Sequence, residues 1–150
     1  MDTRVADQLR LRGGHLDFIG RSHIWIDDYD RADSVRFAQF ALADALTHTA
    51  PGQLEVLVFD DALRGIAAPF QEVNSGGEKI LRHINDVQEL NETIKYLHEH
   101  VRSVLNVIQG RTESLLDFRQ QLSPKVEGFK LVVLSTIYDL LSDEIRDKLT

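Results

Sequence analysis

The sequence predicts an α/β fold: a small, mainly parallel sheet of three to five strands flanked by helices. The first observation is the segment Gln53–Asp61, whose centre, Val56–Phe59, is four consecutive apolar residues between the turn pair Pro51-Gly52 and two aspartates. Such a run is typical of a strand that is buried on both faces, and this strand needs parallel neighbours and covering helices. The second observation is that two other stretches, His23–Asp28 and Phe129–Thr136, can supply those neighbours.

Before the central strand, the chain should form a leader, a strand and a helix. Residues 1–20 hold few apolar anchors and are expected to be a peripheral leader. Ile24–Ile26 is the predicted first strand. A helix should follow, with Asp33 or Ser34 as its N-cap and an end near His48, because its apolar residues recur at helical spacing. With the central strand, these elements predict a strand, helix, strand unit.

After the central strand, the sequence predicts a loop and then a flexible stretch. Residues 62–70 (A-L-R-G-I-A-A-P-F) contain Gly65 and Pro69 as breakers. Residues 74–79 (N-S-G-G-E-K) are expected to be the most flexible part of the chain.

A long helix is predicted over residues 85–110, capped by Asn85 or Asp86 and ended by Gly110. Its apolar residues alternate at spacings of three and four, which also resembles the seam of a parallel two-stranded coiled coil. Packing on the chain's own sheet is favoured, because the positions beside the stripe lack complementary charges. As a candidate interaction helix, its stripe consists of Val87, Leu90, Ile94, Leu97, Val101, Val104 and Ile108.

The remaining elements are a short helix at Glu113–Gln120, the third strand at Phe129–Leu134, and a final helix capped by Ser142. The last helix reaches Thr150 without a glycine or proline to end it. We therefore expect residues 1–150 to be a single α/β domain that belongs to a longer protein.

Composition limits the classes of function. A formal net charge of −7 argues against a broad nucleic-acid-binding surface and against attraction to anionic membranes. The absence of cysteine excludes disulfides, zinc-thiolate sites and thiol catalysis. Neither a signal peptide nor a run of about 20 apolar residues is present, so we expect a cytoplasmic protein without membrane contact.

Two familiar site patterns fail. Gly20-Arg21-Ser22 is similar to the end of a phosphate-binding loop, but Gly14 is one position too distant and a strand, not a helix, is predicted to follow. His98 and His100 lie two residues apart on a helix and point in different directions, so they cannot share a metal ion. No catalytic residue and no metal site is predicted from these patterns.

The candidate site lies at the carboxyl ends of the predicted strands, where parallel sheets collect their chemistry. Several carboxylates there could hold Mg²⁺ for phosphoryl chemistry. The same aspartates could simply be turn residues and helix caps, and this interpretation is favoured because no Lys or Arg accompanies them at a recognisable spacing. The residues are Asp27, Asp28, Asp60, Asp61, Ser135 and Thr136.

A family resemblance adds to this interpretation. The run R-F-A-Q-F-A-L-A-D-A-L-T-H-T-A-P-G-Q-L-E-V-L-V-F-D-D, the long helix after it, S-L-L-D-F-R and F-K-L-V-V-L-S-T-I-Y-D-L-L together resemble the ATPase core of FtsK/SpoIIIE-type (HerA/FtsK) DNA translocases. The resemblance covers about Ser34 to Leu149 and implies a P-loop-NTPase-like fold. Two departures imply a copy that does not hydrolyse nucleotide. No G-x-x-x-x-G-K-[ST] precedes the Ser34 helix, and Ser135 and Thr136 stand where Walker B acids would be.

Three functional hypotheses follow. The first is a non-catalytic assembly or regulatory module of an FtsK-like DNA-translocating ATPase, such as one that serves a DNA-processing or defence system. Its partner would be another protein or an ATPase domain of the same parent chain, with DNA contacted only through that assembly and no cofactor of its own. The second is a phosphoryl-transfer or phosphoacceptor enzyme that uses the strand-end aspartates and Mg²⁺ or ATP. The third is an adaptor that dimerises through the helix at 87–108.

Overall fold

The computed structural model describes residues 24–26, 31–50, 52–74, 80–108, 128–136, 139 and 141–149. The leader predicted at 1–20, the helix predicted at 113–120 and residues 75–79 lie outside the described residues. In chain order the elements are α2 (Arg31–His48), β1 (Leu54–Asp60), the 3₁₀ helix η1 (Ala68–Asn74), β2 (Leu81–Ile84), α3 (Val87–Ile108), β3 (Phe129–Ser135) and α5 (Asp143–Leu149).

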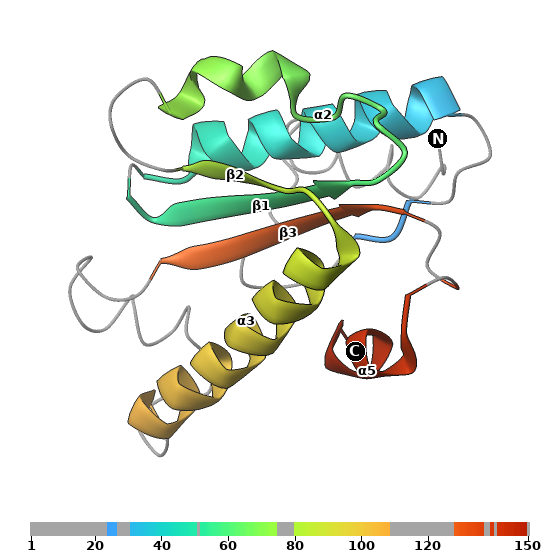
Figure 1. The fold of residues 1–150 in the computed structure, drawn as a ribbon. Coiled ribbons are helices and arrows are strands. Elements are labelled where there is room, and N and C mark those ends of the chain that lie inside the picture. The colour runs from blue at the N-terminus through green and yellow to red at the C-terminus, as the bar shows by residue number, and fades with distance from the viewer. Residues whose placement is uncertain are drawn as a thin grey trace.

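The three strands form an open, all-parallel sheet in the order β2-β1-β3, which confirms the predicted fold class (Figure 1). β1 is the central strand. Its Val56 is level with Leu81 of β2 and with Leu131 of β3. The predicted strands at 54–61 and 129–134 are therefore both present, each within a residue of the expected bounds.

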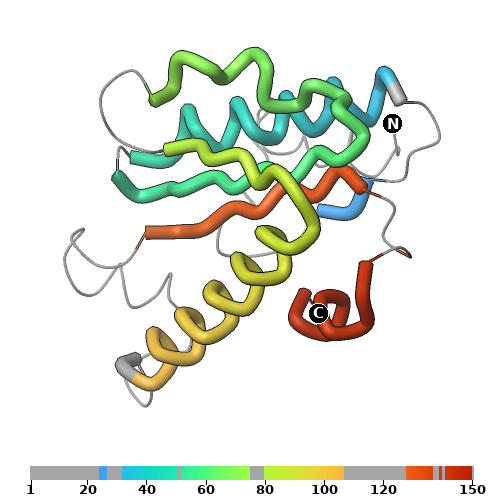
Figure 2. Tube along the Cα trace, in the orientation of Figure 1, coloured from blue at the N-terminus to red at the C-terminus, as the bar shows by residue number. Residues whose placement is uncertain are grey.

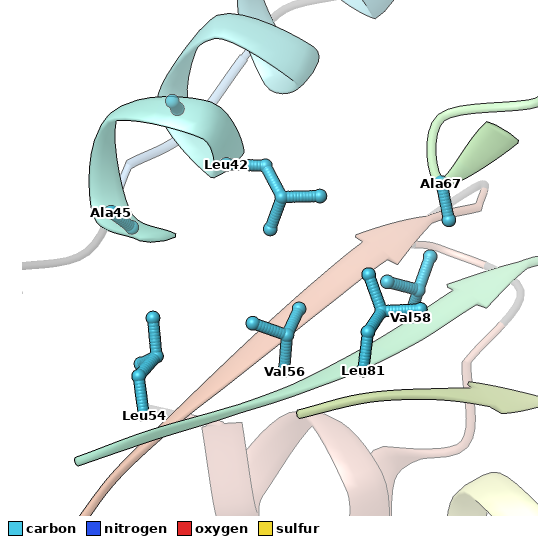
Figure 3. Close-up of a cluster of buried hydrophobic side chains, with 8 residues drawn as sticks. Leu42, Ala45, Leu54, Val56, Val58, Ala67 and Leu81 are labelled. Atoms are coloured by element: carbon cyan, nitrogen blue, oxygen red, sulfur yellow. The ribbon is translucent and has the colours of Figure 1, made fainter. Parts of the chain in front are cut away.

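Helices cover both faces of the sheet, as the run of apolar residues in β1 requires (Figures 1 and 2). On one face, Leu54, Val56 and Val58 pack against Leu42 and Ala45 of α2 (Figure 3). The intervening residues of β1 point the other way, toward α3 and α5. The cluster on that face consists of Leu57, Phe59, Ile84, Leu90, Ile94, Leu141 and Ile145.

The predicted first strand at Ile24–Ile26 is wrong. The segment forms no ladder with the sheet, and Trp25 is 72% exposed. Ile24 alone of these three residues packs against the core. β2 and β3 occupy the two positions beside β1. A segment of three residues buries too little apolar surface to compete with them for a place in the sheet.

The second neighbour of β1 is β2. This strand was not predicted from the sequence, because L-R-H-I is short and polar at its centre. The loop predicted at 62–70 is also only partly correct, since η1 begins at Ala68. Pro69 does not prevent this, because a proline in the first turn of a helix loses no hydrogen bond that the turn would make. η1 ends at Asn74, whose side chain bonds both Ile80 N–H and Leu81 N–H.

The helices begin and end close to where the sequence places them. α2 ends at His48 as predicted but starts at Arg31, so Asp33 lies in its first turn and is not its cap. Ser142 caps α5, where its Oγ accepts a hydrogen bond from Ile145 N–H at 3.3 Å. None of the helices in the described parts of the chain combines the length and apolarity needed to cross a membrane.

Candidate functional site

The carboxyl ends of β1 and β3 form a topological switch point. After β1 the chain crosses to the face covered by α2, where Ala67 joins the core. After β3 it turns to the opposite face, where Leu141 and Ile145 pack with α3. In open parallel sheets, ligands bind where neighbouring strands send their connections to opposite faces. Four of the predicted site residues, Asp60, Asp61, Ser135 and Thr136, lie at this point; the predicted Asp27 and Asp28 lie outside the described residues.

Asp60 is used to build the loop that follows it. Its Oδ1 accepts a hydrogen bond from Arg64 N–H at 3.0 Å, and its Oδ2 accepts bonds from Gly65 N–H at 2.9 Å and Ile66 N–H at 3.4 Å. The Asp60 carbonyl also accepts a bond from Leu63 N–H at 3.2 Å. Both carboxylate oxygens are therefore engaged by backbone donors, as in an aspartate that organises a turn.

The same loop contains two residues in the left-handed region of φ. Leu63 has φ 51° and Gly65 has φ 74°. Glycine adopts this conformation without steric cost, whereas for leucine it is unfavourable by about 1 kcal/mol or more. The bonds to Asp60 offset that cost, so the carboxylate and the loop conformation depend on each other.

Asp61 and Thr136 connect the ends of the two strands. Thr136 Oγ1 donates a hydrogen bond to Asp61 Oδ2 at 2.6 Å, joining residues that are 75 positions apart in the chain. The pair is solvent-accessible. The sequence analysis placed Asp61 and Thr136 in one candidate site, and the structure brings the two side chains together.

Ser135 differs from its neighbours because it is buried, with 6% of its surface exposed. It is level with Asp60 in the ladder. Among the residues that the structure describes, none offers a hydrogen-bond partner to its Oγ. A buried hydroxyl without a partner is unfavourable by about 1–3 kcal/mol relative to a satisfied one. Ser135 is thus a weak point in the packing of β3 and does not face solvent as a substrate-binding hydroxyl would.

Metal binding at this edge receives little support from the described residues. The parts of the chain that the structure describes contain no group of three or more histidine, aspartate or glutamate side chains that could hold a metal ion. The Asp60 carboxylate accepts hydrogen bonds from backbone N–H groups, and the Asp61 carboxylate accepts one from Thr136. Mg²⁺ usually binds through one or two carboxylates and keeps several water ligands, so an ion at this edge would compete with these hydrogen bonds for the carboxylate oxygens.

The candidate interaction helix divides into two halves. Leu90 and Ile94 are buried against the sheet, and Leu97 packs beside them. This confirms the preferred interpretation, in which the helix packs on its own sheet. The stripe then continues beyond the sheet, where Val101 is 52% exposed and Val104 is half-buried. Val87, at the start of the helix, is also exposed, and the side chain of Ile108 lies outside the described part.

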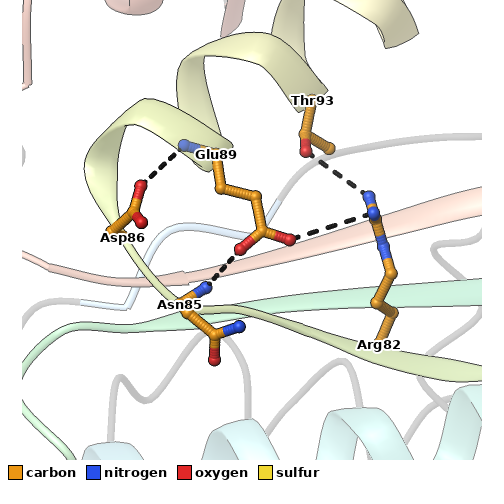
Figure 4. A network of polar contacts seen from close by, with 5 residues as sticks. All are labelled: Arg82, Asn85, Asp86, Glu89 and Thr93. Carbon is orange, nitrogen blue, oxygen red and sulfur yellow. Dashed lines mark hydrogen bonds and ion pairs between the residues drawn. The ribbon is translucent and has the colours of Figure 1, made fainter.

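A polar network fixes the start of α3 to the end of β2 (Figure 4). Asp86 Oδ1 accepts a hydrogen bond from Glu89 N–H at 2.8 Å, and Glu89 Oε2 accepts one from Asn85 N–H at 2.8 Å. Arg82 reaches from β2 to Glu89 at 4.0 Å and to Thr93 Oγ1 at 3.4 Å. The cap at Asp86 was predicted from sequence; the role of Arg82 was not, because β2 itself was not recognised.

The site therefore consists of polar groups that bond one another at the switch point, together with a helix whose outer half exposes the apolar side chains of Val101 and Leu105 among polar ones. Comparison with protein-family models, curated proteins and solved structures found no match to this chain.

Proposed function

We propose that this chain is a non-catalytic α/β module that serves assembly or regulation, of the kind that accompanies the motor domain of an FtsK-like DNA-translocating ATPase. The observation that carries the proposal is the state of the strand-end carboxylates. Asp60 accepts hydrogen bonds from three backbone N–H groups, and Asp61 accepts one from Thr136. We infer that carboxylates engaged in this way serve to hold the loop and the strand ends in place and do not act as a base or a metal ligand.

The order of elements supports the relation to the translocases. Helix α2, strand β1, helix α3 and strand β3 occur in the same order as in the core that the sequence resembles, with η1 and the short strand β2 between β1 and α3. β3 ends in a buried serine and in a threonine bonded to Asp61, where an ATPase would present acidic residues. A hydroxyl cannot neutralise Mg²⁺ as a carboxylate does, so the module would depend on a partner for nucleotide chemistry.

The accessible surfaces suit contact with protein better than contact with DNA. The outer half of α3 presents Val101 and Leu105, each about half exposed. The chain carries a formal net charge of −7, so DNA would be reached only through the assembly. The partner would be another protein or an ATPase domain of the same parent chain.

Thermal unfolding with and without Mg²⁺, ATP and a phosphate analogue tests the proposal. A ligand at 100 times its Kd stabilises a protein by about 2.7 kcal/mol, which for a domain of this size raises Tm by about 5–10 °C. We expect no shift with any of the three. A rise with Mg²⁺ alone or with Mg²⁺ and ATP would refute the non-catalytic interpretation and support the phosphoryl-transfer alternative, and Asp61→Ala would then be the variant to compare.

A further inference from the structure

The loop after β1 directs three consecutive backbone N–H groups to one place. The N–H groups of Arg64, Gly65 and Ile66 all donate to the carboxylate of Asp60, at 3.0, 2.9 and 3.4 Å. Successive backbone N–H groups that converge in a turn form a concave anion-binding arrangement called a nest, which proteins use to hold phosphate and other anions. We refer to residues 63–66 as the β1 nest.

The backbone conformation of the loop is that of a nest. Leu63 and Gly65 have positive φ, 51° and 74°, and Arg64 between them does not. Residues of opposite hand that follow one another turn their N–H groups to the same side of the chain. The convergence on Asp60 is therefore a property of the backbone, and any anion of suitable size in the same place would meet the same three donors.

The β1 nest is held by contacts that do not involve the Asp60 carboxylate. Gly65 C=O accepts hydrogen bonds from Ala68 N–H at 3.1 Å and from Gln39 Nε2 at 3.4 Å. Ile66 and Ala67 are buried, so the end of the loop is anchored in the core. We expect the nest to persist when the carboxylate is removed, with three donors that then lack their acceptor.

The nest is also within reach of solutes. Gly65 is exposed and Asp60 is only half-buried, so an anion from solution can approach the donors. The N–H groups of Arg64 and Ile66 are partly shielded from water. A shielded N–H without an acceptor is unfavourable, and this cost favours the uptake of an anion whenever the Asp60 carboxylate is absent.

We propose that the β1 nest is a binding site for a small oxyanion, a carboxylate or a phosphate group, and that the Asp60 carboxylate occupies it in wild type. The two oxygens of Asp60 stand for two oxygens of the external group. The chain holds this carboxylate at a high effective concentration beside the nest, so free anions do not displace it. Asp60 is thus an internal occupant that keeps the site closed.

This proposal concerns the same strand end as the proposed function. It rests on that function in one respect, namely that the module takes up no phosphate of a nucleotide there. The closed nest supplies a physical reason: an anion site lies at the carboxyl end of the central strand, where parallel sheets collect their ligands, and the chain's own negative charge fills it.

The test is chemical rescue of Asp60→Ala in the whole chain, measured by thermal unfolding. Sodium formate and inorganic phosphate are each compared with sodium chloride at the same ionic strength. At about ten times its Kd, a bound anion should raise the Tm of Asp60→Ala by about 3–6 °C. A rise with formate alone identifies the nest as a carboxylate site, and a rise with phosphate shows that it also accepts a phosphate group.

Asp61→Ala is the matched control. It removes a carboxylate from the neighbouring position and changes the net charge by the same amount, but Asp61 accepts its hydrogen bond from Thr136 and not from the nest. Salts such as phosphate stabilise proteins in general, because they are excluded from the protein surface. Wild type and Asp61→Ala should show only this general effect, and the excess response of Asp60→Ala measures binding.

Two further arms keep the proposal falsifiable. If Asp60→Ala fails to fold, Asp60→Ser takes its place, because the serine hydroxyl can still accept one hydrogen bond in the nest. In the variant that folds, an NMR titration with formate should shift the backbone amide signals of Arg64, Gly65 and Ile66 more than those of the rest of the chain. This measurement locates the anion independently of its effect on stability.

Three results would overturn the proposal. Asp60→Ala and Asp60→Ser could respond to both anions no more than Asp61→Ala does. The amide signals that shift could lie outside the β1 nest. Phosphate could stabilise wild type as much as Asp60→Ala, which would show that Asp60 does not close the site. Variants that ignore the anions leave the proposed function standing, whereas a wild type stabilised by Mg²⁺ refutes the proposed function whatever the variants do.

Discussion

Replacing Asp60 with alanine should destabilise the protein much more than replacing its neighbour Asp61. Asp60→Ala removes the acceptor for three backbone N–H groups, two of them at 3.0 Å or less. A hydrogen bond to a charged group contributes about 1.5–3 kcal/mol when its partner cannot bind water instead. Since the Gly65 donor is exposed and the Ile66 bond is long, we expect a total loss of about 2 kcal/mol.

The assay is reversible unfolding by heat and by urea, monitored by circular dichroism. A loss of about 2 kcal/mol lowers Tm by about 4–8 °C in a protein of this size. Asp61→Ala is the matched control, because it removes one exposed bond to Thr136 and should change stability by about 0.5 kcal/mol. Asp60→Asn retains a carbonyl acceptor and should lie between wild type and Asp60→Ala.

The reasoning would be refuted if Asp60→Ala and Asp61→Ala were equally mild. It would also be refuted if Mg²⁺ raised the Tm of wild type but not that of Asp60→Ala, because Asp60 would then be a metal ligand and not the organiser of the loop.

Three further predictions test the packing and the charges. Ser135→Ala should be neutral or stabilising by up to about 1 kcal/mol, because it removes a buried hydroxyl that has no hydrogen-bond partner among the described residues; a loss above about 1 kcal/mol in urea unfolding would contradict this. Leu90→Ala should cost about 2–5 kcal/mol, because the side chain is 0% exposed, whereas Leu105→Ala, at 51% exposed, should cost less than about 1 kcal/mol; equal losses would show that α3 does not pack as described. The hydrogen bond and the charge of Lys148 lower the pKa of Glu144 from its ordinary value of 4.5. The ion pair should therefore be fully formed above pH 4.5 and be lost as the pH falls through the lowered pKa. In Lys148→Met, an NMR titration should show that the pKa of Glu144 has risen toward its ordinary value.

The sequence by itself determined the central strand and the helices that cover it. Four consecutive apolar residues, Val56–Phe59, place apolar side chains on both faces of a strand, so both faces must be buried. In the structure, alternate residues of β1 do belong to the apolar clusters on the two faces of the sheet. The spacing of the apolar residues in α2 and α3 identified the helices, because a period of 3.6 residues is a local property of the chain. The caps at Asp86 and Ser142 were predictable for the same reason, since each bonds backbone groups within a few residues.

Tertiary structure decided which strands pair with β1. Ile24–Ile26 is more apolar than L-R-H-I at 81–84, yet the latter is in the sheet. The ladder to β1, together with the side chain of Asn74, supplies the backbone bonds that hold β2 in place. Backbone pairing between strands produces no periodic pattern of apolar residues in either segment, so it cannot be recognised from the sequence of one segment alone.

The roles of the strand-end residues also required the fold. An aspartate after a strand suits a turn or a metal site, and the sequence favoured the turn only because no Lys or Arg accompanies it at a recognisable spacing. The role of Asp60 became visible in the hydrogen bonds that its oxygens accept from the N–H groups of Arg64, Gly65 and Ile66. Ser135 and Thr136 are adjacent in sequence, but one is buried and the other bonds Asp61. Which polar group faces solvent depends on the pleat and on the neighbouring strand, and three-dimensional packing alone supplies that information.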